Sequence, residues 1–370
     1  MNLRERFLAS CLGEPVDRVL DTEFGYWDET IERWRGEGLP EHVGFDPEAL
    51  APDDVFAQHF GIDLHWLAHR IPVQMYEPDP LFAEKVLEED EDSQVMVNKR
   101  GILLKIRKRL ASIPHYLRFP VTSLPEFEAI AWRYKPDSPG RYPADWDERA
   151  REYRGREYPL GLQMHGFYGQ LREWMGLENL SVAFYDQPEL VRAMVAFWES
   201  FLIETGAKAL AEVEVDFVRL WEDMSFKSGP LVSAAVFREF FTPAYRRVVA
   251  HFKTHDIPVI QVDSDGNVGL LIELLTEAGV NGLHPFERAA GNDLMALREK
   301  HPQLIMLGGV DKRALAQGKK AIEKEMTQVI RPLVAKGRFV PHVDHAVPPD
   351  VSLEDFSYYL DLKRDMLEKG

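Results

Sequence analysis

The sequence predicts a single-domain (β/α)8 TIM barrel that occupies residues 1–370. After residue 157, six short apolar segments are each followed by a segment of helical length, and this alternation is typical of parallel strands with right-handed crossovers. A chain of 370 residues with 45% hydrophobic residues is also long enough for a barrel with insertions. The six predicted strands are 158–166, 215–223, 257–265, 280–287, 304–311 and 338–345.

The N-terminal part must supply two more strands. Apolar positions at helical spacing predict a helix at 3–12, and residues 19–24 are the predicted first strand. A more weakly marked strand near 65–75 brings the count to eight. Helical periodicity around 56–67 and 81–90 predicts helices that elaborate the barrel mouth.

Two segments are expected to lie outside the eightfold pattern. Residues 93–109 alternate apolar and polar side chains around an Asn-Lys-Arg-Gly turn, which predicts an inserted β-hairpin. Residues 120–157 are rich in Pro, Asp, Arg and aromatic residues and end in an exposed helix. Exposed aromatic side chains at 130–160 fit either a partner surface, as in an oligomer, or a lid over the mouth. An open doubly wound sheet is the alternative fold, but it typically has a Gly-rich phosphate turn, and the sequence contains no GxGxxG.

The composition excludes several classes of protein. No apolar run approaches the roughly 18 residues that span a bilayer, and the charged N-terminus does not fit a signal peptide, so we expect a cytoplasmic protein. The formal net charge of -17 repels polyanions, so nucleic acid is not an expected partner. The single cysteine, Cys11, excludes an internal disulfide and a Cys-pair zinc site, so any metal must be held by nitrogen and oxygen ligands.

Polar residues stand at the ends of the predicted strands, and the C-terminal ends of barrel strands converge on one open face. Such a residue is also an ordinary helix N-cap, and Asp311 before KRALAQG fits that role. Because six consecutive strands show the pattern, we expect several of these side chains to line a pocket. The strand-end residues are Glu23, His165, Glu222, Asp223, Asp263, Asp265, His284, Glu287, Asp311, His342, Asp344 and His345.

The sharpest cluster joins the Asp-Ser-Asp run at 263–265 with the His-Val-Asp-His run at 342–345. Strand alternation puts both carboxylates of the first run on one face. Carboxylate and neutral imidazole suit Zn, Fe, Mn or Ni, so a divalent cation is expected here. The alternative is an Asx-type hydrogen-bonded turn that begins at Asp265.

A second cluster is the run Trp221-Glu222-Asp223 at another strand end. Desolvation or a neighbouring charge raises a carboxyl pKa in such a position and prepares the group for proton transfer. The alternative is that Asp223 only hydrogen-bonds the Lys-Ser-Gly turn at 227–229.

A third cluster begins at His165, which is followed by Tyr168 and Arg172. These side chains offer hydrogen-bond donors to an anionic or carbonyl substrate. Gly166 and Gly169 leave the backbone room to approach a ligand.

These residues resemble the uroporphyrinogen decarboxylase superfamily, which also contains corrinoid-dependent methyltransferases such as methylcobamide:coenzyme M methyltransferase. The resemblance runs over nearly the whole chain and is specific for the superfamily but not for one reaction. It implies a barrel enzyme. The segments that carry it are 4–19, 166–191, 221–249, 257–287, 307–318 and 342–360.

Two differences from the family bear on function. The decarboxylases carry an Arg-containing loop, reading like MRQAGR, that binds substrate carboxylates after the first strand, whereas residues 21–34 here read DTEFGYWDETIERW. Acidic groups there disfavour a porphyrinogen with eight carboxylates. The methyltransferases hold zinc with an HxC pair and a Cys on the last strand, and the matching positions here are Asp263, Asp265 and His345. Oxygen and nitrogen ligands make a more Lewis-acidic centre, suited to an oxygen substrate or water rather than a thiol.

The resemblance therefore implies metal-assisted methyl transfer on a small oxygen- or nitrogen-bearing substrate, with zinc or a similar metal and with a corrinoid protein or a folate as methyl partner. Asp223 or His165, with Glu222, would handle protons. One alternative is decarboxylation of uroporphyrinogen or another carboxylated substrate, for which Arg172 and Arg219 are the nearby arginines. Another is a barrel that binds a metabolite without turning it over. The predicted substrate-binding residues are Glu23, Tyr168, Arg172, Trp221, His284 and Glu287.

Overall fold

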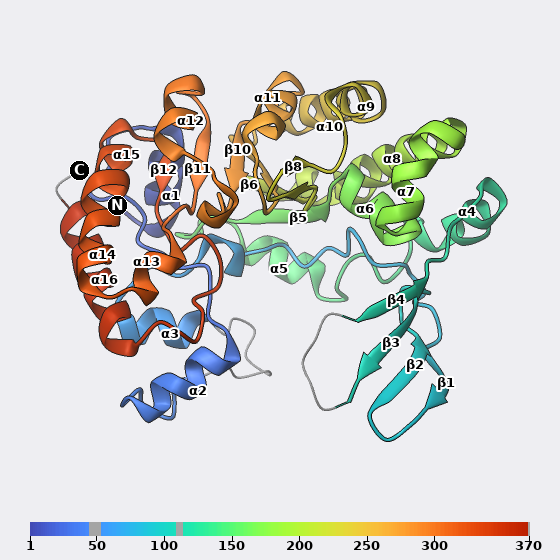
Figure 1. The fold of residues 1–370 in the computed structure, drawn as a ribbon. Helices are drawn as coiled ribbons and strands as arrows, with labels where there is room; N and C mark the ends of the chain where they lie inside the picture. The colour runs from blue at the N-terminus through green and yellow to red at the C-terminus, as the bar shows by residue number, and fades with distance from the viewer. Residues whose placement is uncertain (44–52, 109–113, 369–370) are drawn as a thin grey trace.

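A six-stranded parallel sheet forms the centre of the protein in a computed structural model that describes residues 1–43, 53–108 and 114–368. The strand order is β12-β11-β10-β9-β6-β5, so strands that follow one another in the main alternation also lie side by side (Figure 1). All six strands fall inside the predicted segments. Their bounds are β5 Gly161–His165, β6 Phe217–Trp221, β9 Val259–Asp263, β10 Gly282–His284, β11 Ile305–Leu307 and β12 Phe339–Val340.

Helices connect these strands, as the alternation predicts, and both described ends of the chain lie on one side of the molecule (Figure 1). Asp311 caps α13 by accepting from the backbone N–H of Arg313, which confirms its expected capping role. No helix in the described ranges is long and apolar enough to cross a membrane. The helices are α6 Phe167–Met175, α7 Leu177–Asp186, α8 Pro188–Glu212, α9 Ala234–Val236, α10 Thr242–Lys253, α11 Gly269–Glu277, α12 Leu294–Lys300, α13 Lys312–Ala316, α14 Lys319–Glu325, α15 Arg331–Lys336 and α16 Leu353–Leu367.

Two N-terminal segments extend the edges of this sheet without forming regular strands. At the β5 edge, the N–H of Ile71 donates to the carbonyl of Gly161 (2.8 Å) and the N–H of Gly161 donates to the carbonyl of His69 (3.1 Å). Beyond β12, the N–H of Val347 donates to the carbonyl of Gly25 (2.9 Å). The predicted first strand, 19–24, has no strand hydrogen-bonding pattern, although the carbonyl of Asp21 accepts from the N–H of Asp63.

The remaining N-terminal elements include the insertion, a four-stranded antiparallel sheet that projects away from the parallel sheet (Figure 1). The predicted hairpin is confirmed as β2 and β3, whose turn is closed by a bond from the Gly101 N–H to the Asn98 carbonyl (2.9 Å). The helix predicted at 81–90 is wrong, because this segment contains β1, which pairs with β2 and is exposed along its length. The elements are α1 Leu3–Leu12, α2 Asp28–Gly36, α3 Asp53–Phe60, β1 Lys85–Glu89, β2 Ser93–Val97, β3 Leu103–Arg107, β4 His115–Arg118, α4 Leu124–Ala131 and α5 Trp146–Glu152.

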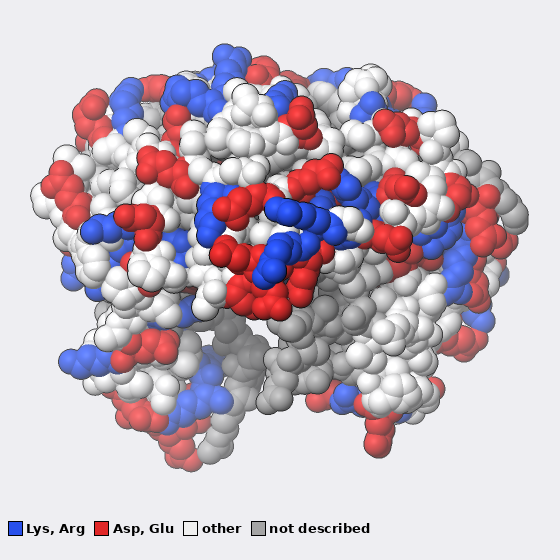
Figure 2. Space-filling view, turned by 180° about the vertical axis from the view of Figure 1, so that it is seen from behind, with Lys and Arg blue, Asp and Glu red and all other residues white. Residues whose placement is uncertain are grey.

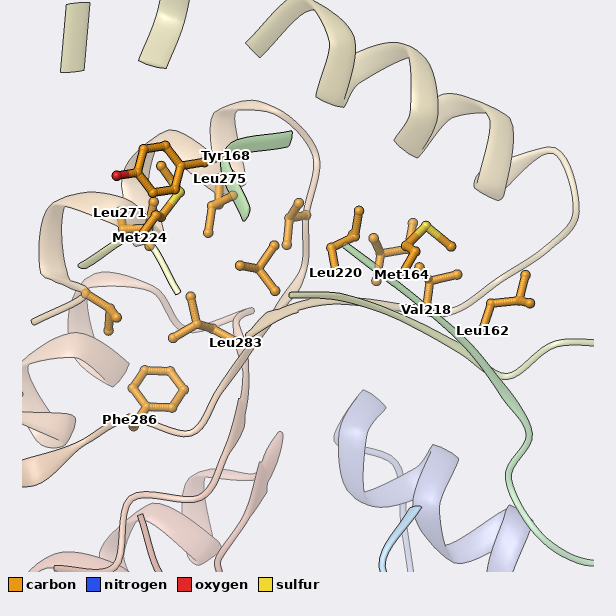
Figure 3. Close-up of a cluster of buried hydrophobic side chains, with 14 of the residues drawn as sticks. Leu162, Met164, Tyr168, Val218, Leu220, Met224, Leu271, Leu275, Leu283 and Phe286 are labelled. Atoms are coloured by element: carbon orange, nitrogen blue, oxygen red, sulfur yellow. The ribbon is translucent and has the colours of Figure 1, made fainter. Parts of the chain in front are cut away.

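The two faces of the parallel sheet bury different side chains. Leu162, Met164, Val218 and Leu220 belong to the large apolar cluster that packs beneath the helices (Figure 3). On the other face, one end is filled by a smaller apolar cluster in which the ring of Phe7 of α1 lies 5.5 Å from Phe217 and 6.2 Å from Trp66. Strand alternation leaves the rest of this second face to the polar residues that form the candidate site. We call the face that carries Phe217 and these polar residues the inner face.

Candidate functional site

The inner face carries a row of polar and aromatic residues at the C-terminal ends of the strands. His165 of β5 pairs in register with Trp221 of β6, Trp221 with Asp263 of β9, and Asp263 with His284 of β10. Because the strands are parallel, these four residues lie side by side along the C-terminal end of the sheet. The row thus brings three of the predicted strand-end residues, His165, Asp263 and His284, to one end of the sheet, and their lining of a pocket stays a prediction.

His284 of that row belongs to a group of three buried histidines with His65 and His342. His65 precedes a short 3-10 turn, Trp66–Ala68, His284 ends β10, and His342 follows β12. Their exposed fractions are 4%, 1% and 0%, and one ring nitrogen of each lies within 4.8 Å of the others. Among the described residues, these three histidines are the set of His, Cys, Asp or Glu side chains that lie close enough together to bind one metal ion.

The free nitrogen of each of these rings is Nε2. In all three, Nε2 is buried and has no hydrogen-bond partner among the described residues. The Nδ1 atoms are engaged: His284 Nδ1 lies 3.2 Å from an Asp263 carboxylate oxygen, His342 Nδ1 lies 2.7 Å from the Val343 carbonyl, and His65 Nδ1 accepts from the Leu67 N–H. Buried polar atoms rarely remain unpaired, so three such atoms in one place could hold a metal ion.

The hydrogen bonds fix two of the three tautomers. The Asp263 carboxylate and the Val343 carbonyl only accept, so His284 and His342 carry the proton on Nδ1 and present a lone pair at Nε2. His65 in this arrangement carries its proton on Nε2, so its Nε2 could bind a metal only after the proton moved to Nδ1 and the contact with the Leu67 N–H was given up. Two ligands are thus preset, and the third is available after one tautomer change.

The charge state of the histidines also suits a metal. Burial lowers the pKa of His65 and of His342 well below the usual value, with a further contribution from neighbouring His284. Burial likewise lowers the pKa of His284, although Asp263 partly opposes this. All three rings are therefore neutral at pH 7, which is the form that binds a metal ion.

The Asp263 carboxylate bonds the His284 ring and so fixes its orientation. Burial alone would raise the pKa of Asp263, but Arg219 and His284 outweigh it and hold that pKa well below its usual range. Arg219 Nε lies 2.9 Å from Asp263 Oδ2, and the Arg219 Nη2 group donates to the same oxygen. A carboxylate that fixes the far nitrogen of a ligating histidine is the usual supporting arrangement of metal sites.

Two more groups on the inner face are buried without partners among the described residues. Both side-chain polar atoms of Gln261 and the indole Nε1 of Trp66 have none. Gln261 lies two residues before Asp263 on β9, and the Trp66 ring lies 5.6 Å from that of His284 and 5.5 Å from that of His342.

The loops that follow the strands carry residues that are more exposed and more acidic than the three histidines. We call this region, with Asp223, Asp265, Glu287 and His345, the mouth. Asp265 Oδ2 lies 4.0 Å from His345 Nε2, and the Asp265 side chain is 41% exposed. Burial, with smaller contributions from Asp263, Asp223 and Glu287, raises the pKa of Asp265 to about 7. A carboxyl group with this pKa exchanges protons readily near neutral pH.

The predicted metal ligands Asp263, Asp265 and His345 do not lie as close together as the three histidines do. Asp265 and His345 are neighbours, but Asp263 is bound to Arg219 and His284, and the three do not form a group with metal-binding spacing among the described residues. The pattern of polar residues at strand ends includes His284 and His342. It did not point to His65, which precedes a single 3-10 turn in a weakly patterned segment.

The predicted proton-transfer residues have different surroundings. The His165 ring stacks on Tyr76 and lies at a tilt to Trp221, and burial lowers the pKa of His165 to about 3, so it is a poor base near neutral pH. Glu222 is fully buried and accepts from the Gly169 N–H and the Tyr245 hydroxyl.

Asp223 lies at the mouth with a positive φ of 43°. Its carboxylate pairs with Arg172 Nη2 at 3.0 Å, and its carbonyl accepts from Arg172 Nη1 at 2.6 Å. The partner of Asp223 is thus Arg172, not the 227–229 turn.

The predicted substrate-binding residues divide into two groups. Trp221, with the Arg172 guanidinium 5.0 Å from its ring, lies beside His165, and Glu287 bonds the Lys312 ammonium (3.3 Å) at the mouth.

Glu23 and Tyr168 belong to the second group, which is fully enclosed. Glu23 binds Lys363, the Tyr359 hydroxyl and the Val343 N–H, so it anchors α16 to the end of β12. Tyr168 is 0% exposed. Neither side chain is presented to solvent at the mouth.

Comparison with known proteins gives the family of the chain. The family model described as Uroporphyrinogen decarboxylase (URO-D) matches residues 169–366, which is more than half of the chain. The chain belongs to the uroporphyrinogen decarboxylase family. The match covers β6 and β9–β12, and so includes all the strand-end residues of the site from Trp221 onward.

Solved structures support the fold of this family member. A methyltransferase from Methanosarcina mazei aligns with a TM-score of 0.62 at 17% identity over 99% of both chains, which shows a shared fold. A Xaa-Pro dipeptidase with bound methionine in the active site aligns with a TM-score of only 0.25 at 10% identity, over 81% of this chain and 71% of that chain, and carries no argument. A search of curated proteins by sequence finds no match.

Proposed function

We propose that this member of the uroporphyrinogen decarboxylase family is an enzyme of metal-assisted methyl transfer, with the metal held by His65, His284 and His342. The observation that carries the proposal is the set of three buried, neutral imidazoles whose Nε2 atoms have no partner among the described residues. A corrinoid protein or a folate would be the methyl partner, and the substrate a small molecule with an oxygen or nitrogen acceptor.

The metal would act as a Lewis acid that polarises the acceptor atom of the substrate. Arg219 holds Asp263, and Asp263 keeps the His284 ring in the orientation that presents Nε2. At the mouth, Asp265 can take up or release the acceptor proton, because its pKa is raised to about 7. Asp265 replaces His165 in this role, since buried His165 remains neutral down to about pH 3.

The proposal includes a closed eight-stranded barrel in a single domain. The segment at 69–71 bonds the β5 edge, and the segment at 25–27 bonds the chain just beyond β12. A bond from Asp63 to Asp21 links the two N-terminal segments to each other. These contacts support an arrangement in which the two segments complete the ring.

Metal analysis separates the two possible ligand sets. Protein purified without chelator is expected to contain one divalent ion per chain, and His342→Ala is expected to lose it. Asp265→Ala, at the neighbouring mouth, serves as the matched control and is expected to keep the ion. Loss in Asp265→Ala with retention in His342→Ala would support the Asp263, Asp265 and His345 site instead.

Activity distinguishes methyl transfer from the other functions. The metal-loaded protein is expected to demethylate methylcobalamin or a methylated corrinoid protein in the presence of a suitable acceptor, which changes the visible spectrum of the corrinoid. Consumption of uroporphyrinogen without corrinoid turnover would favour decarboxylation. A metal-free protein that turns over neither would be the metabolite-binding barrel.

A further inference from the structure

A separate cavity of about 420 Å³ lies beside β5, where segment 69–71 bonds the edge of the sheet. Segment 68–74 and Tyr76 form one wall, and Arg149, Tyr153 and Tyr158 lie on another. Gln163 of β5 also lines it. The volume lies in the range of pockets that bind small organic molecules.

The charge of this cavity is opposite to that of the protein as a whole. The chain has a formal net charge of -17, and acidic and basic side chains are mixed over the face seen in Figure 2. The cavity lining, by contrast, contains Arg70 and Arg149 and no Asp or Glu. Such a lining concentrates positive potential where the rest of the molecule repels anions.

Arg70 is the cation that remains uncompensated. Arg70 is exposed, its Nη1 donates to Gln163 Oε1 at 2.9 Å, and no ion pair of its guanidinium is found among the described residues. Arg149, in comparison, is already paired with Asp145 at 2.8 Å on α5. A guanidinium with several free N–H groups is the preferred partner of a carboxylate or phosphate.

Aromatic side chains complete the lining. Tyr76, Tyr153 and Tyr158 contribute ring faces and phenol groups, and His69 stacks on Tyr158 with ring centroids 4.2 Å apart. Tyr76 also stacks on His165, 4.7 Å away, so one lining ring of the cavity contacts the first residue of the strand-end row. Rings and a cation together favour a planar ligand that carries a negative group.

We propose that this cavity binds a small aromatic anion, a carboxylate or a phosphate, through Arg70. The negative group of the ligand bonds the Arg70 guanidinium, and its ring packs among the tyrosines. This binding step stands apart from the proposed methyl transfer, because none of the three histidines lines the cavity. It is therefore measured on the full chain after the metal has been removed with a chelator.

Isothermal titration calorimetry with benzoate and with phenyl phosphate tests the proposal, and benzamide is the neutral analogue. We expect saturable one-site binding of at least one anion, with the tighter of the two identifying the acid class, and none of benzamide. Arg70→Gln is expected to weaken binding about tenfold or more, because it removes a charge-assisted hydrogen bond. Arg149→Gln should have a smaller effect, since Arg149 is shared with Asp145.

Arg151→Gln is the matched control, since Arg151 lies on α5, is exposed and does not line the cavity. It should leave binding unchanged, and circular dichroism should show all variants folded. Absence of saturable binding of both anions, equal binding of benzamide, or equal effects of Arg70→Gln and Arg151→Gln would overturn the proposal.

Discussion

The inner face of the sheet and the mouth above it contain the same residue types in opposite surroundings. On the inner face, the histidines are at most 4% exposed and their Nε2 atoms bond no described residue. At the mouth, Asp265 is 41% exposed and lies 4.0 Å from His345, and Glu287 is paired with Lys312. Burial without a partner is costly, whereas exposed charges are solvated. Unsatisfied buried groups therefore indicate a ligand site more strongly than a cluster of exposed acids does.

The largest expected effect compares a buried lysine of α16, Lys363, with a partly exposed lysine at the mouth, Lys312. Lys363 is fully buried against Asp21 (2.8 Å) and Glu23, so Lys363→Met leaves two buried acids without their cation. We expect the free energy of unfolding in urea to fall by about 3–5 kcal/mol. Lys312→Met at the mouth should cost less than about 1 kcal/mol, because the Lys312–Glu287 pair is partly solvated. Equal losses of unfolding free energy in the two variants would show that burial does not make the Lys363 ion pairs more important for stability than the Lys312–Glu287 pair.

A pH series sharpens the comparison for Glu222, a buried acid with no cation bonded to it. Burial is the main cause that raises the pKa of Glu222 from 4.5 to about 7. The folded state thus favours the protonated form, and this contribution to stability is complete below pH 4.5 and is lost as the pH rises through 7. Relative to Glu222→Gln, the unfolding free energy of the native chain should fall by about 3 kcal/mol between pH 4 and pH 8. A difference that does not vary with pH would show that Glu222 is ionised throughout.

The smallest expected effect concerns the residue between the two regions. Asp263→Asn keeps the shape of the side chain but weakens the hold on the His284 ring, so metal affinity should fall about 10- to 100-fold in a chelator competition. Asp265→Asn, two residues further on, should change it less than about threefold if the metal is on the histidines. The reverse order of the two effects would move the metal to the mouth.

Much of the fold follows from local sequence pattern. The six C-terminal strands and the 98–101 turn are marked by continuous apolar runs or alternation, and each appears where it is predicted. The helix predicted at 81–90 fails because the stretch Lys85–Glu89 is too short for periodicity to separate a helix from a strand, and pairing with β2 decides it. The predicted strand at 19–24 has no regular ladder, since its polar residues bond side chains of α16 instead.

The candidate site is predicted less completely, for a physical reason. The sequence pattern brings His165, Asp263, His284 and His342 to the C-terminal ends of their strands, because parallel strands end on the same side of the sheet. Which of these groups is neutral, paired or free depends on neighbours that are distant in the sequence. Arg219 neutralises Asp263, and His65 joins the two other histidines from the other end of the chain.

X-ray absorption spectroscopy of the metal-loaded protein tests the central claim most directly. Three histidine ligands predict three metal–nitrogen distances of about 2.0–2.1 Å with imidazole scattering from three rings. His342→Ala should reduce the ring contribution or abolish binding. A spectrum dominated by carboxylate oxygens with scattering from a single imidazole would contradict the account and place the metal at Asp263, Asp265 and His345.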